Sequence, residues 1–197
     1  MKYFTVILFG IFIGIFGVMG FAAASQLLVL KEPRIISIAG PISEKTAIDT
    51  IAQLKYLNSS SNEEIEIDIT SPGGSVYAGL AIIDAMAASS SPIKTVCEGY
   101  CMSMGGVILA AGTHGRRFAM PLSTILLHQV SSKSEGTLTE LENDLKETQR
   151  LQNIMTVVLE KATGLDKDKL NIIMNHDNFM TPATAKELNL IDGIVGK

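Results

Sequence analysis

One short pattern occurs twice in this chain: an apolar strand-like stretch, a glycine-rich turn and a helix-like stretch. The first copy runs from Glu64–Thr70 through the turn Ser71–Ser75 into Val76–Ala88. The second runs from Ile93–Glu98 through the turn Gly99–Gly106 into another apolar, helix-like segment. Strands that alternate with helices favour parallel pairing, so this pattern predicts an α/β fold with a largely parallel sheet.

The flanking segments extend the same alternation. Arg34–Ala39 is predicted to be a strand, and Ser43 can cap a helix that reaches about Leu57. Further along the chain, strands are expected around Phe118 and over Ile125–Gln129. These strands extend the expected sheet. No further internal repeat or low-complexity segment is evident in the body of the chain.

A long helix is expected after the last of these strands. Thr137 and Glu140 have the spacing of a capping box, and Gly164 can end the helix. Apolar residues recur along it at helical spacing, as in an amphipathic helix. A helix this long in a domain this small is expected to project and to pack on another chain. The alternative is a helix that folds back on its own core.

Composition excludes some classes of function. The 197 residues carry a net charge of −4 and show no basic cluster, so nucleic-acid binding is not expected. Cys97 and Cys101 are too few for a disulfide framework and lack further ligands for zinc. We expect both as small buried hydrophobes, and we expect neither a metal nor a cofactor.

Residues 1–25 differ from the rest of the chain. Lys2 is the one charged side chain among them, and Thr5–Met19 is nearly all apolar. The segment is long enough for a transmembrane anchor. It also fits a cleaved secretory signal, because Ala22-Ala23-Ala24 precedes Ser25. The length of the apolar run favours the anchor, and the protein is then membrane-associated; a cleaved signal would make it an exported protein.

A serine in the second glycine-rich turn is the leading candidate for chemistry. Ser103 lies between strand and helix. A serine hydroxyl needs an adjacent base and an accessible position to act as a nucleophile. Among three histidines, His128 ends an apolar strand, whereas His114 lies in a charged turn and His176 in a polar segment. The bland alternatives stay open here: a packing contact for Ser103 and a core histidine for His128.

Four blocks, in this order, resemble the proteolytic subunit of the Clp proteases (the ClpP family). The blocks are Ser71-Pro72-Gly73-Gly74, the Gly99–Gly106 turn with Ser103, His128-Gln129, and Asp177-Asn178-Phe179. The resemblance covers about Leu28 to Lys197, which leaves residues 1–25 as a separate segment. It implies a Clp protease/crotonase-like α/β spiral of repeated ββα and βα units with a projecting helical handle.

The resemblance also implies an activity and its residues. It indicates a serine-type endopeptidase that acts on peptides or unfolded proteins. Ser103 would be the nucleophile, His128 the base, and Asp177 the group that orients the imidazole. The backbone amides of Gly74 and Met104 would form the oxyanion hole. From the pattern alone the aspartate is the weakest assignment, because other aspartates lie downstream: Asp144, Asp166 and Asp168.

The family pattern implies partners, and the chain departs from it in places. Members form homo-oligomeric stacked rings through the handle, and an AAA+ unfoldase docks on apolar side chains of the strand before Ser71. Here Glu66 and Asp68 occupy those positions, which puts an ATPase partner in doubt. Val130–Glu135 also lacks the glycines that usually follow the histidine block.

Three other classes of protein stay open. A catalytically idle ring scaffold would keep the fold, although the intact Ser103, His128 and Asp177 set argues against it. A membrane-bound signal-peptide peptidase relative would use a serine–lysine dyad and leave His128 and Asp177 without a role. A crotonase-type acyl-CoA enzyme would share the broad fold without needing the serine.

Overall fold

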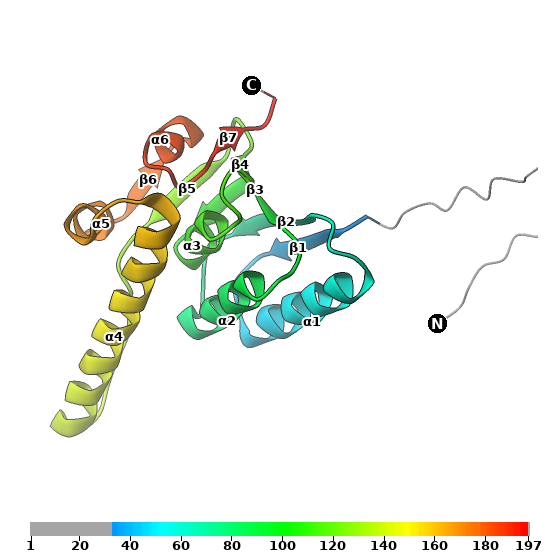
Figure 1. The fold of residues 1–197 in the computed structure, drawn as a ribbon. Helices are drawn as coiled ribbons and strands as arrows, with labels where there is room; N and C mark the ends of the chain where they lie inside the picture. The colour runs from blue at the N-terminus through cyan, green and yellow to red at the C-terminus, as the bar shows by residue number, and fades with distance from the viewer. Residues whose placement is uncertain (1–32, 197) are drawn as a thin grey trace, which may run out of the picture. The chain divides into compact units, whose positions relative to one another are not determined.

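Residues 33–196, which the computed structural model describes, contain one seven-stranded sheet (Figure 1). Its strands are β1 Ile35–Ala39, β2 Ile65–Ser71, β3 Ile93–Met102, β4 Arg117–Ala119, β5 Thr124–Leu127, β6 Asn178–Met180 and β7 Gly193–Ile194. The main path runs β1-β2-β3-β4-β7, with β5 beside β3 and β6 beside β5. All of these pairs are parallel except β5 with β6. The expected α/β fold with a largely parallel sheet is confirmed.

The helices begin where the capping residues predict. They are α1 Glu44–Ser60, α2 Val76–Ala87, α3 Met104–Ala110, α4 Leu138–Thr163, α5 Lys167–Met174 and α6 Pro182–Glu187. Ser43 and Thr137 each form a capping box, and Gly164 ends α4 at a φ of 73°. The first helix extends three residues beyond the expected Leu57, to Ser60. Local capping chemistry therefore fixes most helix starts in this chain.

Strand β3 is longer than expected and changes its partner halfway. Its first part pairs with β4 over Thr95–Cys97, and its last part pairs with β5 over Tyr100–Met102. Between the two parts, Glu98–Tyr100 bulges out opposite the single residue Thr70, whose hydroxyl donates to the Glu98 carbonyl at 2.6 Å. The bulge lets the sheet continue past Glu98, where the sequence pattern predicts that the strand ends.

The same bulge joins the two cysteines. Cys97 and Cys101 are fully buried, as expected, but they form a disulfide instead of two unpaired thiols. Four residues of regular strand span about 13 Å, which no disulfide can bridge. The bulge shortens the Cα–Cα separation to 5.8 Å and so makes the pairing possible.

An ion pair with a buried arginine connects the second half of the sheet to two helix ends. Arg117 is 2% exposed, and its guanidinium donates to both carboxylate oxygens of Asp192 at 3.0 and 2.7 Å. Its remaining nitrogen donates to the carbonyls of Ala110 and Ala162, at the ends of α3 and α4. Burial alone would raise the pKa of Asp192, but the hydrogen bonds from Arg117 outweigh it and lower that pKa.

Helix α4 projects from the rest of the chain over its first half (Figure 1). The second half packs on the core through buried residues that include Leu151, Met155 and Leu159. The first half leaves large apolar side chains exposed, namely Leu138, Leu141 and Leu145. The expected projection is confirmed for the first half, and the alternative of a folded-back helix describes the second.

The expected anchor or signal at residues 1–25 lies outside the described residues. Within residues 33–196, none of the helices combines the length and apolarity that crossing a membrane requires.

Strand β2 alternates between core and surface as predicted. Ile65, Ile67 and Ile69 are fully buried, while Glu66 and Asp68 lie on the opposite face. Partial burial, then the charges of Glu66 and Glu98, raise the pKa of Asp68 to about 6. An ion pair of 2.8 Å between Lys94 and Glu66 only partly offsets this repulsion.

This raised pKa makes the Asp68 charge a cost to folding at neutral pH. The folded pKa of about 6 lies above the ordinary aspartate value of 3.8, so the folded state binds more protons and stability falls as pH rises between those values. We expect Asp68→Asn to raise the free energy of unfolding by about 1 kcal/mol near neutral pH, because solvent screens part of the charge. Urea titrations at neutral and acidic pH measure this gain, which should shrink below the folded pKa. The exposed Asp84→Asn change is the control, and an equal gain at both pH values would contradict the prediction.

Candidate active site

Ser103 occupies a sharp turn where β3 ends and α3 begins. Its φ of 52° and ψ of −122° place a non-glycine residue in a left-handed region of the backbone. Such a conformation costs about 1–3 kcal/mol and persists only where the surroundings hold it. Here the Ser103 amide donates to the Leu126 carbonyl at 2.8 Å, and α3 starts at the next residue. The geometry resembles the strained strand-to-helix turns that present nucleophiles.

His128 lies beside this turn because β5 runs parallel to the end of β3. Parallel strands end at the same edge of a sheet, and β5 ends at Leu127. His128 follows directly, and its Nε2 lies 2.7 Å from the Ser103 hydroxyl oxygen. The structure thus brings together two residues that the sequence separates by 25 positions.

Asp177 reaches the other side of the same imidazole. Strand β6 pairs antiparallel with β5, with Asn178 opposite Leu127. The residue before Asn178 therefore faces the residue after Leu127, and Asp177 Oδ1 lies 3.4 Å from His128 Nδ1. This distance is longer than a well-formed N–H···O hydrogen bond.

The competing residues lie elsewhere in the fold. Asp166 caps α5 by accepting from the Lys169 amide, and Asp168 lies in the first turn of that helix. Asp144 lies on the exposed side of α4. His114 and His176 are both exposed, and the described contacts do not bring either of them to Ser103. The described contacts thus bring Ser103, His128 and Asp177 together and none of these other residues.

The first glycine-rich turn packs against the Ser103 turn. A Cβ added to Gly73 would lie 2.7 Å from the Ser103 Cβ, so only glycine allows this approach. Gly74, at a φ of 152°, is held against Ile42 by a short parallel bridge. In the part of the chain that the structure describes, the amides of Gly74 and Met104 donate to no other group. The Met104 amide is free because it begins a helix.

Two glutamines, to which the sequence pattern assigns no role, link segments that lie beside the site. Gln129 donates from its backbone amide to the Met174 carbonyl at 2.8 Å and from its side chain to the Asn175 carbonyl at 3.1 Å. Gln152, on α4, accepts from the Val130 amide at 2.8 Å. These contacts join segments 22 to 46 residues apart, and no local spacing reveals them.

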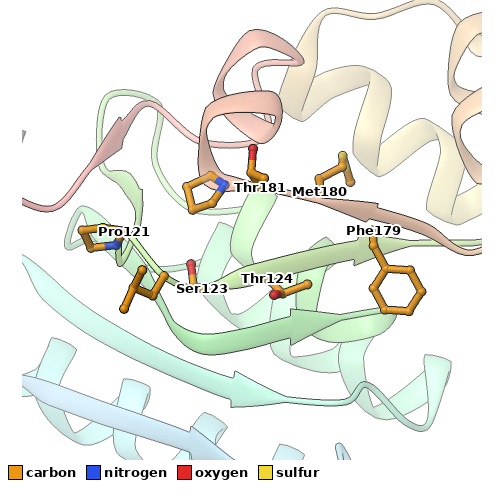
Figure 2. A pocket seen from close by; sticks show the side chains of 8 residues that line it. Pro121, Ser123, Thr124, Phe179, Met180 and Thr181 are labelled. Atoms are coloured by element: carbon orange, nitrogen blue, oxygen red, sulfur yellow. The ribbon is translucent and has the colours of Figure 1, made fainter.

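An open apolar groove lies at the far end of the β5–β6 pair (Figure 2). Its volume is about 400 Å³, and its walls include Pro121 in the turn before β5, Thr124 at the start of β5 and Met180 at the end of β6. Leu122 and Phe179 at this groove are 95% and 62% exposed. Because His128 and Asp177 lie at the opposite ends of these strands, the groove is separate from the candidate site.

Comparison with known proteins agrees with this arrangement. The sequence profile of the Clp protease family matches residues 21–197. The ATP-dependent Clp protease proteolytic subunit of Deinococcus radiodurans is 41% identical over 167 residues, which make up 84% of this chain and 82% of the relative. The chain therefore belongs to the Clp protease family of serine endopeptidases.

Proposed function

We propose that this chain hydrolyses peptide bonds with Ser103 as nucleophile, His128 as general base and Asp177 as the group that orients the imidazole. The observation that carries the proposal is the 2.7 Å contact between His128 Nε2 and the strained Ser103 hydroxyl. The 3.4 Å contact with Asp177 supports the tautomer in which Nδ1 carries the proton and Nε2 accepts.

The reaction divides into two steps. In the first, the Ser103 oxygen attacks the peptide carbonyl while His128 takes the hydroxyl proton and then delivers it to the leaving amine. In the second, His128 activates water, which hydrolyses the acyl-enzyme and restores the serine. The carboxylate of Asp177 stabilises the imidazolium that forms in each step. This chemistry uses no metal and no cofactor.

The backbone amides of Gly74 and Met104 are proposed as the oxyanion hole. Both amides lack an acceptor within the described residues, and the two turns that carry them pack against each other at Gly73. An oxyanion that forms at Ser103 would accept from both amides, which stabilises the charge that develops in the transition state. Peptides and unfolded proteins are the proposed substrates.

Replacing the nucleophile tests this function directly. Ser103→Ala should abolish hydrolysis of a small fluorogenic peptide and labelling by a fluorophosphonate, because Ser103 is the one hydroxyl among the described residues that contacts the His128 imidazole. His128→Ala should cost nearly as much, since the members of such a unit act together.

Circular dichroism and thermal unfolding serve as controls for the fold of both variants. The exposed His114→Ala change is the matched control and should keep full activity. Unchanged peptide turnover in the folded Ser103→Ala protein would refute the assignment.

We further propose that the protein forms homo-oligomeric rings that stack through α4. The exposed leucines of its first half, Leu138, Leu141 and Leu145, recur at a spacing that places them on one side of the helix. An apolar stripe that none of the described residues covers is typical of an interface.

A charge in this stripe should divide the assembly. Leu145→Lys is expected to lower the oligomeric state in analytical ultracentrifugation without unfolding the rest of the chain, because Leu145 is 59% exposed. Asn143→Lys, an exposed position on the opposite side of the same helix, is the control and should assemble normally. An unaltered native protein that sediments as a monomer at micromolar concentration would rule the proposal out.

The surface that an ATPase partner would use is the acidic face of β2. Glu66 pairs with Lys94, and Asp68 and Glu98 add charge beside them. An apolar loop that docked here would have to desolvate these groups, at a cost on the order of a few kcal/mol for each unpaired carboxylate. We therefore propose that the usual unfoldase does not dock on this face.

Mixing experiments test this proposal. The protein should cleave short peptides without ATP and fail to degrade a folded substrate when a Clp ATPase from a relative is added. Tyrosine at both positions 66 and 68 should restore some binding of that ATPase, because the apolar surface returns. Degradation of the folded substrate by the unmodified protein with that ATPase and ATP would contradict the proposal.

We also propose that residues 1–25 attach the protein to a membrane, and that the protein is exported if this segment is instead a cleaved signal. The support is the apolar run with Lys2 as its one charge. The mass of the mature N-terminus, together with membrane fractionation, separates the two outcomes.

A further inference from the structure

We infer that Gln129 is a positioning residue that holds Asp177 in register with His128. The inference rests on the proposed function, because it concerns the orienting carboxylate of that site. The question it answers is what keeps that carboxylate in place.

The Asp177 side chain is poorly held by its own contacts. It is 67% exposed, and its contact with His128 is 3.4 Å long. Among the described residues, no other side chain or amide donates to its carboxylate. The position of the carboxylate therefore depends on the backbone that carries it, the short connection between α5 and β6.

That connection is fixed on one side by the sheet. Strand β6 pairs with β5 from Asn178 onward, and the Asn178 side chain donates to the Ile173 carbonyl at 3.2 Å. These contacts set where the chain leaves the Asp177 position.

On the side of α5, Gln129 donates two hydrogen bonds to the start of the connection. Its backbone amide binds the Met174 carbonyl at 2.8 Å, and its side-chain amide binds the Asn175 carbonyl at 3.1 Å. Gln129 directly follows His128 in the chain. A single residue therefore ties the strand that carries the base to the connection that carries the orienting group.

Helix α4 binds the residue that follows Gln129. The next residue, Val130, donates its amide to Gln152 at 2.8 Å, and the Gln152 side chain also reaches the Met174 sulfur at 4.0 Å. The end of β5, the end of α5 and α4 thus meet through two glutamines. Because the Met174 carbonyl is held by the Gln129 backbone, losing the Gln129 side chain should loosen the connection without unfolding it.

Gln129→Met removes the side-chain donor and keeps an unbranched chain of similar length. We expect kcat for a fluorogenic peptide to fall about fivefold, the effect of one ordinary hydrogen bond, with KM little changed. The acidic limb of the kcat/KM profile should move to lower pH, because a less well-placed carboxylate favours the imidazolium less. Gln149→Met on α4, where the side chain makes no hydrogen bond with the described residues, is the matched control and should leave both unchanged.

A double-mutant cycle distinguishes positioning from a general structural effect. In an Asp177→Ala background, Gln129→Met should cause no further loss, because Gln129 acts through Asp177. An equal loss in both backgrounds, or an unshifted pH profile in Gln129→Met, would overturn the inference. Fluorophosphonate labelling of the unmodified protein distinguishes failure of the proposed function from failure of this inference. An unlabelled, inactive protein refutes the proposed function. An active protein in which the losses are additive refutes only the role of Gln129.

Discussion

The buried guanidinium of Arg117 is the interaction on which the rest of the fold depends. It neutralises Asp192 beside β7 and donates hydrogen bonds to the carbonyls of Ala110 and Ala162, at the ends of α3 and α4. Removing Asp192 would leave the buried guanidinium charge without compensation, at a cost on the order of a few kcal/mol. Helix α3 starts at the Ser103 turn, so the fixed end of α3 also limits how far that turn can move.

The sequence predicts the regular parts of this fold because their signals are local. Capping residues such as Ser43 and Thr137 define where helices start, and the strict alternation of β2 defines which side chains are buried. The extension of β3 beyond Gly99 has no signal in the sequence, because glycine normally weakens a strand and the bulge depends on the pairing of neighbouring strands. Strands β6 and β7, of three and two residues, are too short to show any periodicity.

The candidate site likewise combines residues that have a local sequence signal with residues that have none. Ser103 and His128 stand out locally, one in a glycine-rich turn and the other at the end of an apolar strand. Asp177 was identified only through the family resemblance, because no local pattern separates it from the other acidic residues downstream. The antiparallel return of β6 is what places it, and the contact from Gln129 to Asn175 spans 46 residues. Contacts between segments so far apart follow from the topology of the chain and not from its local composition.

The disulfide between Cys97 and Cys101 has a consequence for strand register. Its loop is so short that closing it restricts the unfolded chain by only about 2 kcal/mol. Its larger effect is local, because it fixes the number of residues that bulge out between the two halves of β3. A slip of one residue in the second half would exchange the two faces of the strand. The covalent link forbids that slip immediately before the turn at Ser103, so the hydroxyl meets the imidazole in a single alignment of the strand.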